Sequence, residues 1–390
     1  MNSNLWKLAA TQGLFLTNNV VFIAINGLVG LRLAPAGWMA TLPVMGYVVG
    51  GALATGLVAA SQRRWGRKVS FQLGLLVALM SVLVCALALV AGNFWLLVAG
   101  TVVAGYYSAN GQLYRFAAGE LAAPAFREKA VSLVLAGGLV GAVVGPNLAN
   151  HTRNLFSIPF LGAYLALAGV ALLSMGVMAT IRFPHGPGKT GGGGGGRPLA
   201  EIARQPEFIV AAAGAALSYG VMNLLMAATP LAMDICGMPF ADAAFVLQWH
   251  VIGMFAPGFV TGSLIARHGV LRVMAAGLAL NALCIAIALS GQDLHRFTVA
   301  LFVLGVGWNF LFTSSTTLAM RSYRPEEKDK AQAAINFGVF TIMAITSFAS
   351  GALVTTHGWT WLNLGSTLPV GLLAGALAWL AAIQRRHAAR

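Results

Sequence analysis

The chain of 390 residues is 58% hydrophobic and only 9% charged, whereas a soluble domain carries about 25% charged residues. This composition excludes an ordinary soluble protein, because most of the apolar surface must face lipid or other helices. The 24 lysine and arginine residues outnumber the 10 acidic ones and give a net charge of +14, which could suggest nucleic acid. The positive charges lie, however, in short loops between apolar runs, as in membrane proteins. We therefore expect membrane lipid, and no nucleic acid, as a partner.

Apolar runs of the length needed to cross a bilayer, roughly 20 residues, recur along the whole chain. We predict an all-α membrane protein with twelve transmembrane helices at 8–31, 38–60, 70–91, 94–117, 131–151, 159–181, 208–232, 241–265, 271–290, 297–320, 332–355 and 360–383. With a cytoplasmic N-terminus, all lysines and arginines except Arg32, Arg153 and Arg296 lie on the cytoplasmic side. This asymmetry predicts a bacterial inner (plasma) membrane protein with both termini in the cytoplasm.

The longest loop between spans divides the chain into two parts. It runs from Arg182 to Glu207 and contains the glycine run Gly191 to Gly196, which is typical of a flexible tether. We therefore expect an N-terminal six-helix half at 1–181, a cytoplasmic linker at 182–207 and a C-terminal six-helix half at 208–390. The halves echo each other, because charged turns at 125–130 and 327–331 follow spans four and ten. Two parallel six-span repeats around a cavity are typical of the major facilitator superfamily.

Two motifs carry a resemblance to that superfamily. The segment Arg64-Trp65-Gly66-Arg67-Lys68 is similar to its loop between spans two and three, with the pattern D-R-x-G-R-K. Arg63 stands where the family usually has an acidic residue, which puts the usual charge relay to a neighbouring helix in doubt. Gly141-x-x-x-Gly145-Pro146 in span five resembles a second family motif, and small residues at that spacing let helices pack closely. The resemblance implies two six-helix bundles and a monomer.

The predicted membrane interior contains almost no ionisable groups. None of the ten acidic residues lies deep in a span, and Arg115 lies near the end of span four, where it can extend toward the interface. His250 is the one ionisable residue at depth, and such residues often mark ion pathways because they are costly to insert. The interior therefore suits a small soft cation or a neutral organic molecule better than a large charged substrate.

Spans seven and eight carry two pairs of candidate metal ligands. Met222 and Met226 share one face of span seven, and His250 and Met254 share one face of span eight, because each pair is spaced i, i+4. Two thioethers facing an imidazole and a third thioether form a soft, uncharged set that suits Cu(I). The possible path by which the metal reaches this set is Met233, Cys236 and Met238 at the outer turn. The alternative is core packing, because methionine in an apolar helix most often fills gaps.

Together these two pairs resemble the motifs of the CcoA-like bacterial copper transporters of this superfamily. The resemblance implies that Met222, Met226, His250 and Met254 bind copper, and that the chain imports Cu(I) to supply haem–copper oxidase assembly. Copper is then the transported substrate, and no cofactor is expected. A neutral His250 is needed for binding, so low pH would weaken uptake.

A neutral organic substrate such as riboflavin is the alternative, because relatives of the copper importers resemble riboflavin transporters. Trp249 or Trp308 would stack on the flat ring, and asparagine and glutamine side chains of the spans would bind its polar edges. Many of these polar groups would otherwise make hydrogen bonds between helices. An enzyme is not expected, because the sequence contains no nucleophile with a paired base, no phosphate-binding loop and no carboxylate pair.

Overall fold

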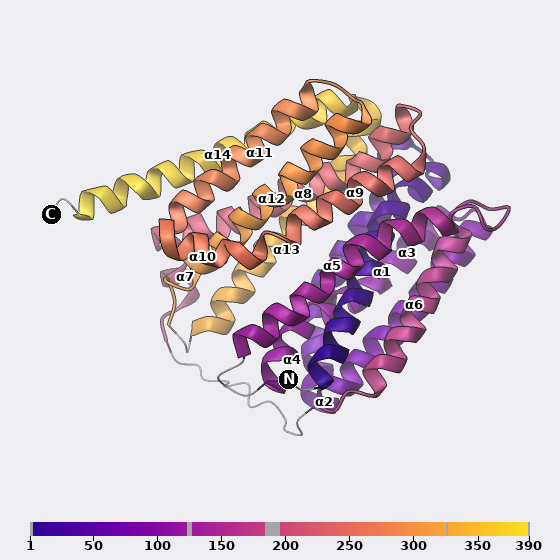
Figure 1. Ribbon diagram of the computed structural model, residues 1–390, viewed down its shortest axis with the longest axis horizontal. Coiled ribbons are helices and arrows are strands. Elements are labelled where there is room, and N and C mark those ends of the chain that lie inside the picture. Colours follow the sequence, from indigo (N-terminus) through magenta and orange to yellow (C-terminus); the bar gives the residue numbers. More distant parts are fainter. Residues whose placement is uncertain (1–2, 123–126, 184–195, 325–326, 389–390) are drawn as a thin grey trace.

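The computed structural model describes residues 3–122, 127–183, 196–324 and 327–388, and this part of the chain is helical without a strand (Figure 1). The helices of the first half are α1 (Ser3–Leu33), η1 (Gly37–Met39), α2 (Leu42–Val90), α3 (Phe94–Gly111), α4 (Tyr114–Leu121), α5 (Arg127–Thr152) and α6 (Leu161–Ala179). Those that follow are α7 (Leu199–Ile202), α8 (Pro206–Ile235), α9 (Phe240–Phe255), α10 (Gly258–His268), α11 (Val270–Leu289), α12 (Leu294–Ala319), α13 (Lys328–Thr356) and α14 (Gly358–Ala388). The all-α prediction is confirmed.

The number of candidate spans in the described residues differs from the predicted twelve. Nine helical segments in the described residues are long and apolar enough to cross a membrane, and the bent pair α9–α10 makes up to ten. The structure joins predicted spans two and three into the single element α2, with a break at Gly66 (φ 77°, ψ 172°). The prediction of twelve spans is thus not confirmed helix by helix.

Two spans predicted as continuous are broken in the structure. Span four divides into α3 and α4 at residues 112–113, where the Phe15 ring occupies the space that a side chain on Gly111 would need. Span eight divides into α9 and α10, which differ in direction by 40°. The second break lies at Pro257, which has no N–H to continue the helical hydrogen bonds.

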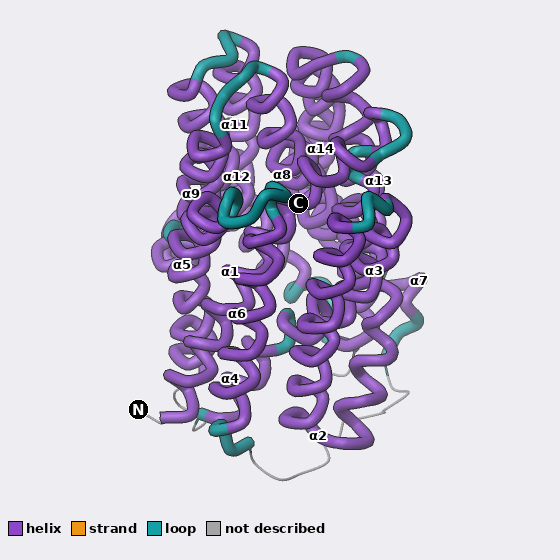
Figure 2. Tube along the Cα trace, turned by 90° about the vertical axis from the view of Figure 1, so that its right-hand side faces the viewer, coloured by secondary structure: helices purple, strands orange, loops and turns teal. Residues whose placement is uncertain are grey.

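In Figure 1, α1 to α6 form an indigo-to-magenta group and α8 to α14 a rose-to-yellow group, while the exact bounds of the two halves stay a prediction. The tube in Figure 2 shows helices running side by side along the length of the molecule. The two groups meet where α5 packs on α9 and α2 packs on α13. Most of the predicted linker, including glycines 191–195, lies outside the described residues, and its described end contains α7 and the start of α8 at Pro206.

Close packing of α5 on α1 depends on glycine, as the motif in span five predicts. A side chain on Gly141 would meet Leu16 and the backbone at Thr17, and one on Gly137 would meet the backbone of Ala9. Gly145 faces the Thr17 carbonyl more loosely, at 3.2 Å from an ideal Cβ position. Since small residues permit the shortest helix separations, this glycine face of α5 explains the tight contact with α1.

One end of the bundle carries the break at Gly66 in α2, the turn at 320–324 and α7, and we call it the linker end. Here Arg67 Nε donates to Glu120 Oε2 on α4 over 2.6 Å, and Arg67 also contacts Gln62. Lys68 donates to the Ala179 carbonyl at the end of α6. The predicted motif loop thus makes an ion pair with a neighbouring helix through Arg67, and its role as a conformational motif stays a prediction.

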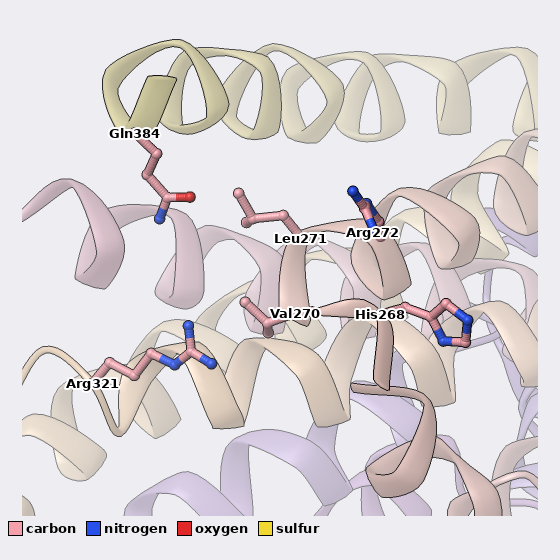
Figure 3. A pocket seen from close by; sticks show the side chains of 7 residues that line it. His268, Val270, Leu271, Arg272, Arg321 and Gln384 are labelled. Atoms are coloured by element: carbon pink, nitrogen blue, oxygen red, sulfur yellow. The ribbon is translucent and has the colours of Figure 1, made fainter. Parts of the chain in front are cut away.

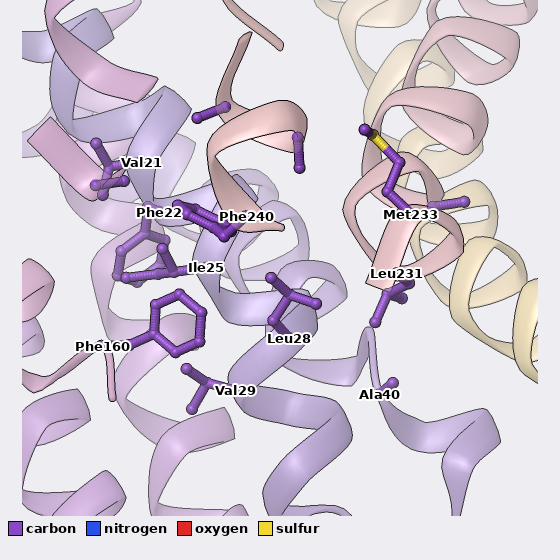
Figure 4. Packing of buried hydrophobic residues seen from close by; sticks show 14 of the residues in the cluster. Val21, Phe22, Ile25, Leu28, Val29, Ala40, Phe160, Leu231, Met233 and Phe240 are labelled. Carbon is purple, nitrogen blue, oxygen red and sulfur yellow. The ribbon is translucent and has the colours of Figure 1, made fainter. Parts of the chain in front are cut away.

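The opposite end, which we call the far end, is closed by contacts between the halves. Figure 4 shows Phe22, Ile25 and Leu28 of α1 in the same buried cluster as Leu231, Met233 and Phe240 of the second half. The guanidinium of Arg153 lies 5.1 Å from the ring centroid of Phe160 and 5.2 Å from that of Phe240. It therefore makes cation–π contacts with both halves at once.

Two sets of hydrogen bonds also join the halves toward the far end. Thr41 Oγ1 accepts from the Gly351 amide at 3.0 Å and lies 3.4 Å from the Phe348 carbonyl. The amide of Asn147 on α5 donates to Gln248 Oε1 on α9 over 2.7 Å. At the linker end, by contrast, Arg67 and Lys68 contact other residues of the first half. Arg197 of the linker contacts Glu327 of the second half, and Gln384 contacts Glu207 at the start of α8.

Candidate functional site

Four aromatic side chains of the second half form one group near the interior of the molecule. Trp308 and Phe312, one turn apart on α12, stack with centroids 5.1 Å apart and an interplanar angle of 11°. Tyr219 on α8 meets both rings edge-on, at 5.3 Å and 5.4 Å. Phe255 at the end of α9 lies 6.3 Å from Trp308. We call these four residues the aromatic cluster; edge-on and offset contacts of this kind hold rings in fixed orientations.

The three predicted methionine ligands pack beside this aromatic cluster. Met222, Met226 and Met254 are buried and share one apolar group with Leu247, Trp308 and Ala24 of α1. The structure thus brings the three thioethers together, as their helical spacing predicts. Their neighbours are apolar and aromatic, and methionine fills irregular gaps in such surroundings and contacts rings through sulfur.

His250 is fully buried, one turn before Met254 on α9. Its Nδ1 lies 2.6 Å from the Leu301 carbonyl on α12. A carbonyl can only accept a hydrogen bond, so Nδ1 carries the proton and, in a neutral ring, Nε2 is the acceptor. In the described part of the chain Nε2 has no hydrogen-bond partner. His250 therefore keeps one acceptor available inside the membrane.

Other buried polar atoms between the halves also have no hydrogen-bond partner among the described residues. They are Asn18 Nδ2 and Asn19 Oδ1 on α1 and Trp308 Nε1 on α12. Buried polar groups are nearly always satisfied by protein, water or ligand. Trp308 belongs to the aromatic cluster, and Asn18 and Asn19 lie on α1, the helix that contributes Ala24 to the apolar group beside it. These polar atoms suit an uncharged molecule with donors and acceptors.

The predicted metal path at the outer turn is not assembled as an open route. Met233 is fully buried in the cluster that closes the far end, and Met238 packs against the same cluster. Cys236 is exposed and its thiol donates to Gln292 Oε1 over 3.2 Å. In the described conformation the contacts between α1, α8 and α9 bury Met233, and an entry path through Met233, Cys236 and Met238 stays a prediction.

Of the two tryptophans expected to stack on a flat substrate, only Trp308 is in the interior. Trp308 is 7% exposed, whereas Trp249 is 39% exposed and lies with Phe245 and Phe302 in an exposed aromatic group. Phe312, Phe255 and Tyr47 were not among the residues expected to line a cavity. The i, i+4 spacing of Trp308 and Phe312 is the signal that could have identified Phe312, because it places both rings on one helix face.

Comparison with known sequences finds transporters that are similar to this chain over most of its length. A riboflavin transporter, RfnT of Brucella anthropi, is 38% identical over 366 residues, which cover 92% of this chain and 91% of that protein. An uncharacterised MFS-type transporter of Bacillus subtilis, YddS, is 27% identical over 87% of this chain and 82% of its own length.

The similarity to a riboflavin transporter overturns the expectation of copper import. The expected functions in copper transport and cytochrome oxidase assembly are therefore wrong, and the alternative of a neutral organic substrate is favoured. The CcoA-like resemblance is not confirmed, and metal binding by Met222, Met226, His250 and Met254 stays a prediction.

Solved structures and a family model identify the fold. The nucleoside transporter NupG superposes with a TM-score of 0.76 at 11% identity, covering 96% of this chain and 99% of that one. A bacterial homologue of the iron transporter ferroportin, in an inward-facing state, gives 0.71 at 15% identity, covering 97% and 99%. The model of the Major Facilitator Superfamily matches residues 8–257 and 211–390. The chain therefore belongs to the Major Facilitator Superfamily and is a membrane transporter rather than an enzyme.

Proposed function

We propose that this chain carries riboflavin across the bacterial inner membrane into the cell, as a monomer with both termini in the cytoplasm. The observation that carries the proposal is the 38% identity to a riboflavin transporter over 92% of the chain. The distribution of lysine and arginine supports the orientation, because the linker end carries most of these residues and positive loops stay in the cytoplasm.

The aromatic cluster supplies what the flavin ring requires. Riboflavin is neutral and has a flat tricyclic ring, a polar edge with both donors and acceptors, and a hydroxylated ribityl chain. The stacked pair Trp308 and Phe312, with Tyr219 edge-on, offers a large apolar surface of fixed orientation. Met222, Met226 and Met254 extend that surface. Sites for small molecules combine such apolar walls with a few placed polar groups.

The unpartnered polar atoms fit the rest of the molecule. His250 Nε2 is an acceptor and Trp308 Nε1 is a donor, while Asn18 and Asn19 offer one of each from the first half. All of these groups are uncharged when His250 is neutral, so an uncharged substrate leaves no buried charge unpaired. Groups from α1 on one side and α9 and α12 on the other would then close on the substrate when the two halves rock.

The described conformation corresponds to one state of the transport cycle. The far end is closed by Arg153, Thr41 and the α1–α8 contacts, whereas the linker-end ion pairs of the described residues do not join the two halves. This arrangement is what a state opening toward the cytoplasm requires. Transport would need these far-end contacts to break so that riboflavin can reach the aromatic cluster from outside.

Growth and uptake in a riboflavin auxotroph test the proposal. Cells that express the chain should grow on low external riboflavin and accumulate labelled riboflavin, and cells without it should not. Lumiflavin, which has the ring but no ribityl chain, should compete for uptake, and ribitol should not, because stacking supplies most of the binding. Uptake equal to that of empty cells, with the chain present in the membrane, would overturn the proposal.

A further inference from the structure

The two halves differ in charge at one equivalent turn of the linker end. In the first half Gly66 has φ 77° and ψ 172°, and in the second half Gly269 has φ 86° and ψ 152°. Each glycine lies between two successive spans, so the two turns correspond. The residue after Gly66 is Arg67, which is paired with Glu120 of α4. The residue after Gly269 is Val270, and Arg321 just beyond α12 lies beside it.

At this turn of the second half, the arginine side chains have no carboxylate partner in the described part of the chain. A cavity of about 350 Å³ is lined by the turn and its neighbours, namely His268, Gly269, Val270, Leu271, Arg272, Arg321 and Gln384. Among the described residues neither Arg272 nor Arg321 makes an ion pair or side-chain hydrogen bond. The nearby carboxylate of Glu207 accepts from Gln384 at 3.4 Å rather than from an arginine.

The arrangement of these groups suits a phosphate. Figure 3 shows the residues that line this cavity: His268 ends α10, Arg272 lies on α11, Arg321 follows α12 and Gln384 lies on α14. His268 Nδ1 lies 3.3 Å from the Leu264 carbonyl, which leaves Nε2 for another contact. Guanidinium groups bind phosphate oxygens through paired N–H donors. The cavity is also far larger than one water molecule, which takes about 30 Å³ in the liquid.

We propose that this cavity binds the phosphate group of an anionic phospholipid at the linker end of the second half. Free phosphate shares the chemistry, but the surroundings favour a lipid. The adjoining helix α14 is mostly exposed to the membrane, with Leu368, Leu372 and Trp379 exposed along it. Acyl chains can lie on that apolar surface, and tryptophan is enriched at the level of headgroups. Basic pockets between helices on the cytoplasmic side bind such headgroups.

Lipid retention by the purified full-length chain tests the site. Native mass spectrometry would count phosphatidylglycerol and phosphatidylcholine bound to the wild type, to Arg272→Gln, to Arg321→Gln and to the double variant. Each lost arginine should weaken phosphatidylglycerol binding about fivefold, as expected for one charge near a headgroup, and phosphatidylcholine binding should change little. Arg204→Gln is the matched control, because it removes an exposed arginine just before α8 that does not line the cavity.

A second variant keeps the test independent of simple charge loss. Arg321→Glu places a carboxylate opposite Arg272, as Glu120 stands opposite Arg67 in the first half, and it should abolish retention while the chain stays folded. Competition identifies the source: excess inorganic phosphate that displaces the lipid, and protects the wild type but not the double variant from heat, would assign the site to free phosphate. Phosphatidylglycerol binding that is equal in the wild type, the double variant and Arg321→Glu would overturn the proposal.

Discussion

The two ends of this transporter are held together in different ways. At the far end, Arg153 contacts rings of both halves, Thr41 bonds to α13, and α1 packs into one cluster with α8 and α9. At the linker end, Arg67 pairs with Glu120 within the first half, and Arg197 of the linker pairs with Glu327 of the second half. The far end therefore holds the halves to each other, whereas the linker end holds each half together as a rigid body.

This difference indicates which contacts must change during transport. Moving a rigid half requires no rearrangement of the pairs inside it, so the linker-end ion pairs can persist through the cycle. The far-end contacts cross between halves and must break for the opposite side to open. Substitutions at the far end should therefore alter the conformational equilibrium, and substitutions at the linker end should alter stability.

The largest effect is expected from fixing the far end shut. Cysteines at Asn147 and Gln248, whose side chains are 2.7 Å apart across the halves, should be joined by a short bis-methanethiosulfonate crosslinker, which forms a reducible disulfide with each thiol. Riboflavin uptake should stop on crosslinking and return with a reductant, because the halves can no longer separate there. The background is Cys236→Ser, which removes the exposed native thiol.

The matched control is a crosslink at the same end within one half. Native Cys236 lies 3.2 Å from Gln292 Oε1, so Gln292→Cys allows a bridge that does not cross between halves. Uptake should survive this bridge. If both crosslinks left uptake unchanged, the far end would not need to open.

A smaller effect is expected from one far-end hydrogen bond. Thr41→Val removes the oxygen that accepts from the Gly351 amide. A hydrogen bond of this kind contributes about 0.5–1.5 kcal/mol, so the population with an open far end should rise about two- to tenfold. Distances between spin labels at positions 147 and 248 measure that population. Thr298→Val, which loses only a bond to Leu294 within its own helix, should not change it; an equal shift in both variants would remove the special role of Thr41.

The smallest effect on transport is expected at Glu327, although its substitution should lower the Tm. Hydrogen bonds from the Arg197 side chain, and then from the Arg324 amide, hold the pKa of the Glu327 carboxyl well below its usual range. A lowered carboxyl pKa stabilises the fold above the unfolded pKa, about 4.3, and this contribution is lost only as the pH falls toward the folded value. The Tm difference between wild type and Glu327→Gln should thus be constant from about pH 8 to pH 5.5.

Glu201 provides the control for this comparison. It lies 3.9 Å from the same arginine but is 58% exposed, and exposed pairs contribute little. Glu201→Gln should therefore leave the Tm nearly unchanged. A Tm difference for Glu327→Gln that disappears between pH 8 and pH 6 would contradict a lowered pKa.

The sequence was sufficient to predict the helical class and the superfamily, because apolar runs and the motif around Gly66 can be recognised from consecutive residues alone. It also placed Met222, Met226 and Met254 on facing helices, because helical spacing fixes which residues share a face. The breaks at residues 112–113 and at Pro257 were missed: the first involves the distant ring of Phe15, and membrane helices often tolerate proline.

The substrate could not be assigned from the same residues for a physical reason. Methionines and a histidine at i, i+4 spacing are compatible with a soft metal site and with the wall of an apolar cavity. The spacing does not show that Trp308 packs against the methionines, that His250 bonds to Leu301, or that Trp249 faces outward. Those facts depend on contacts of α12 with α8 and α9, and α12 is separated from both helices in the sequence.

Riboflavin binding to the purified chain tests the central claim most directly, by fluorescence titration of the wild type, Trp308→Ala and Trp249→Ala. Loss of stacking on one aromatic ring costs about 1–3 kcal/mol, so Trp308→Ala should raise the Kd by about 5- to 150-fold. Trp249→Ala removes an equally large but outward-facing ring and should leave the Kd unchanged. Equal Kd values for all three proteins would contradict a flavin site at the aromatic cluster.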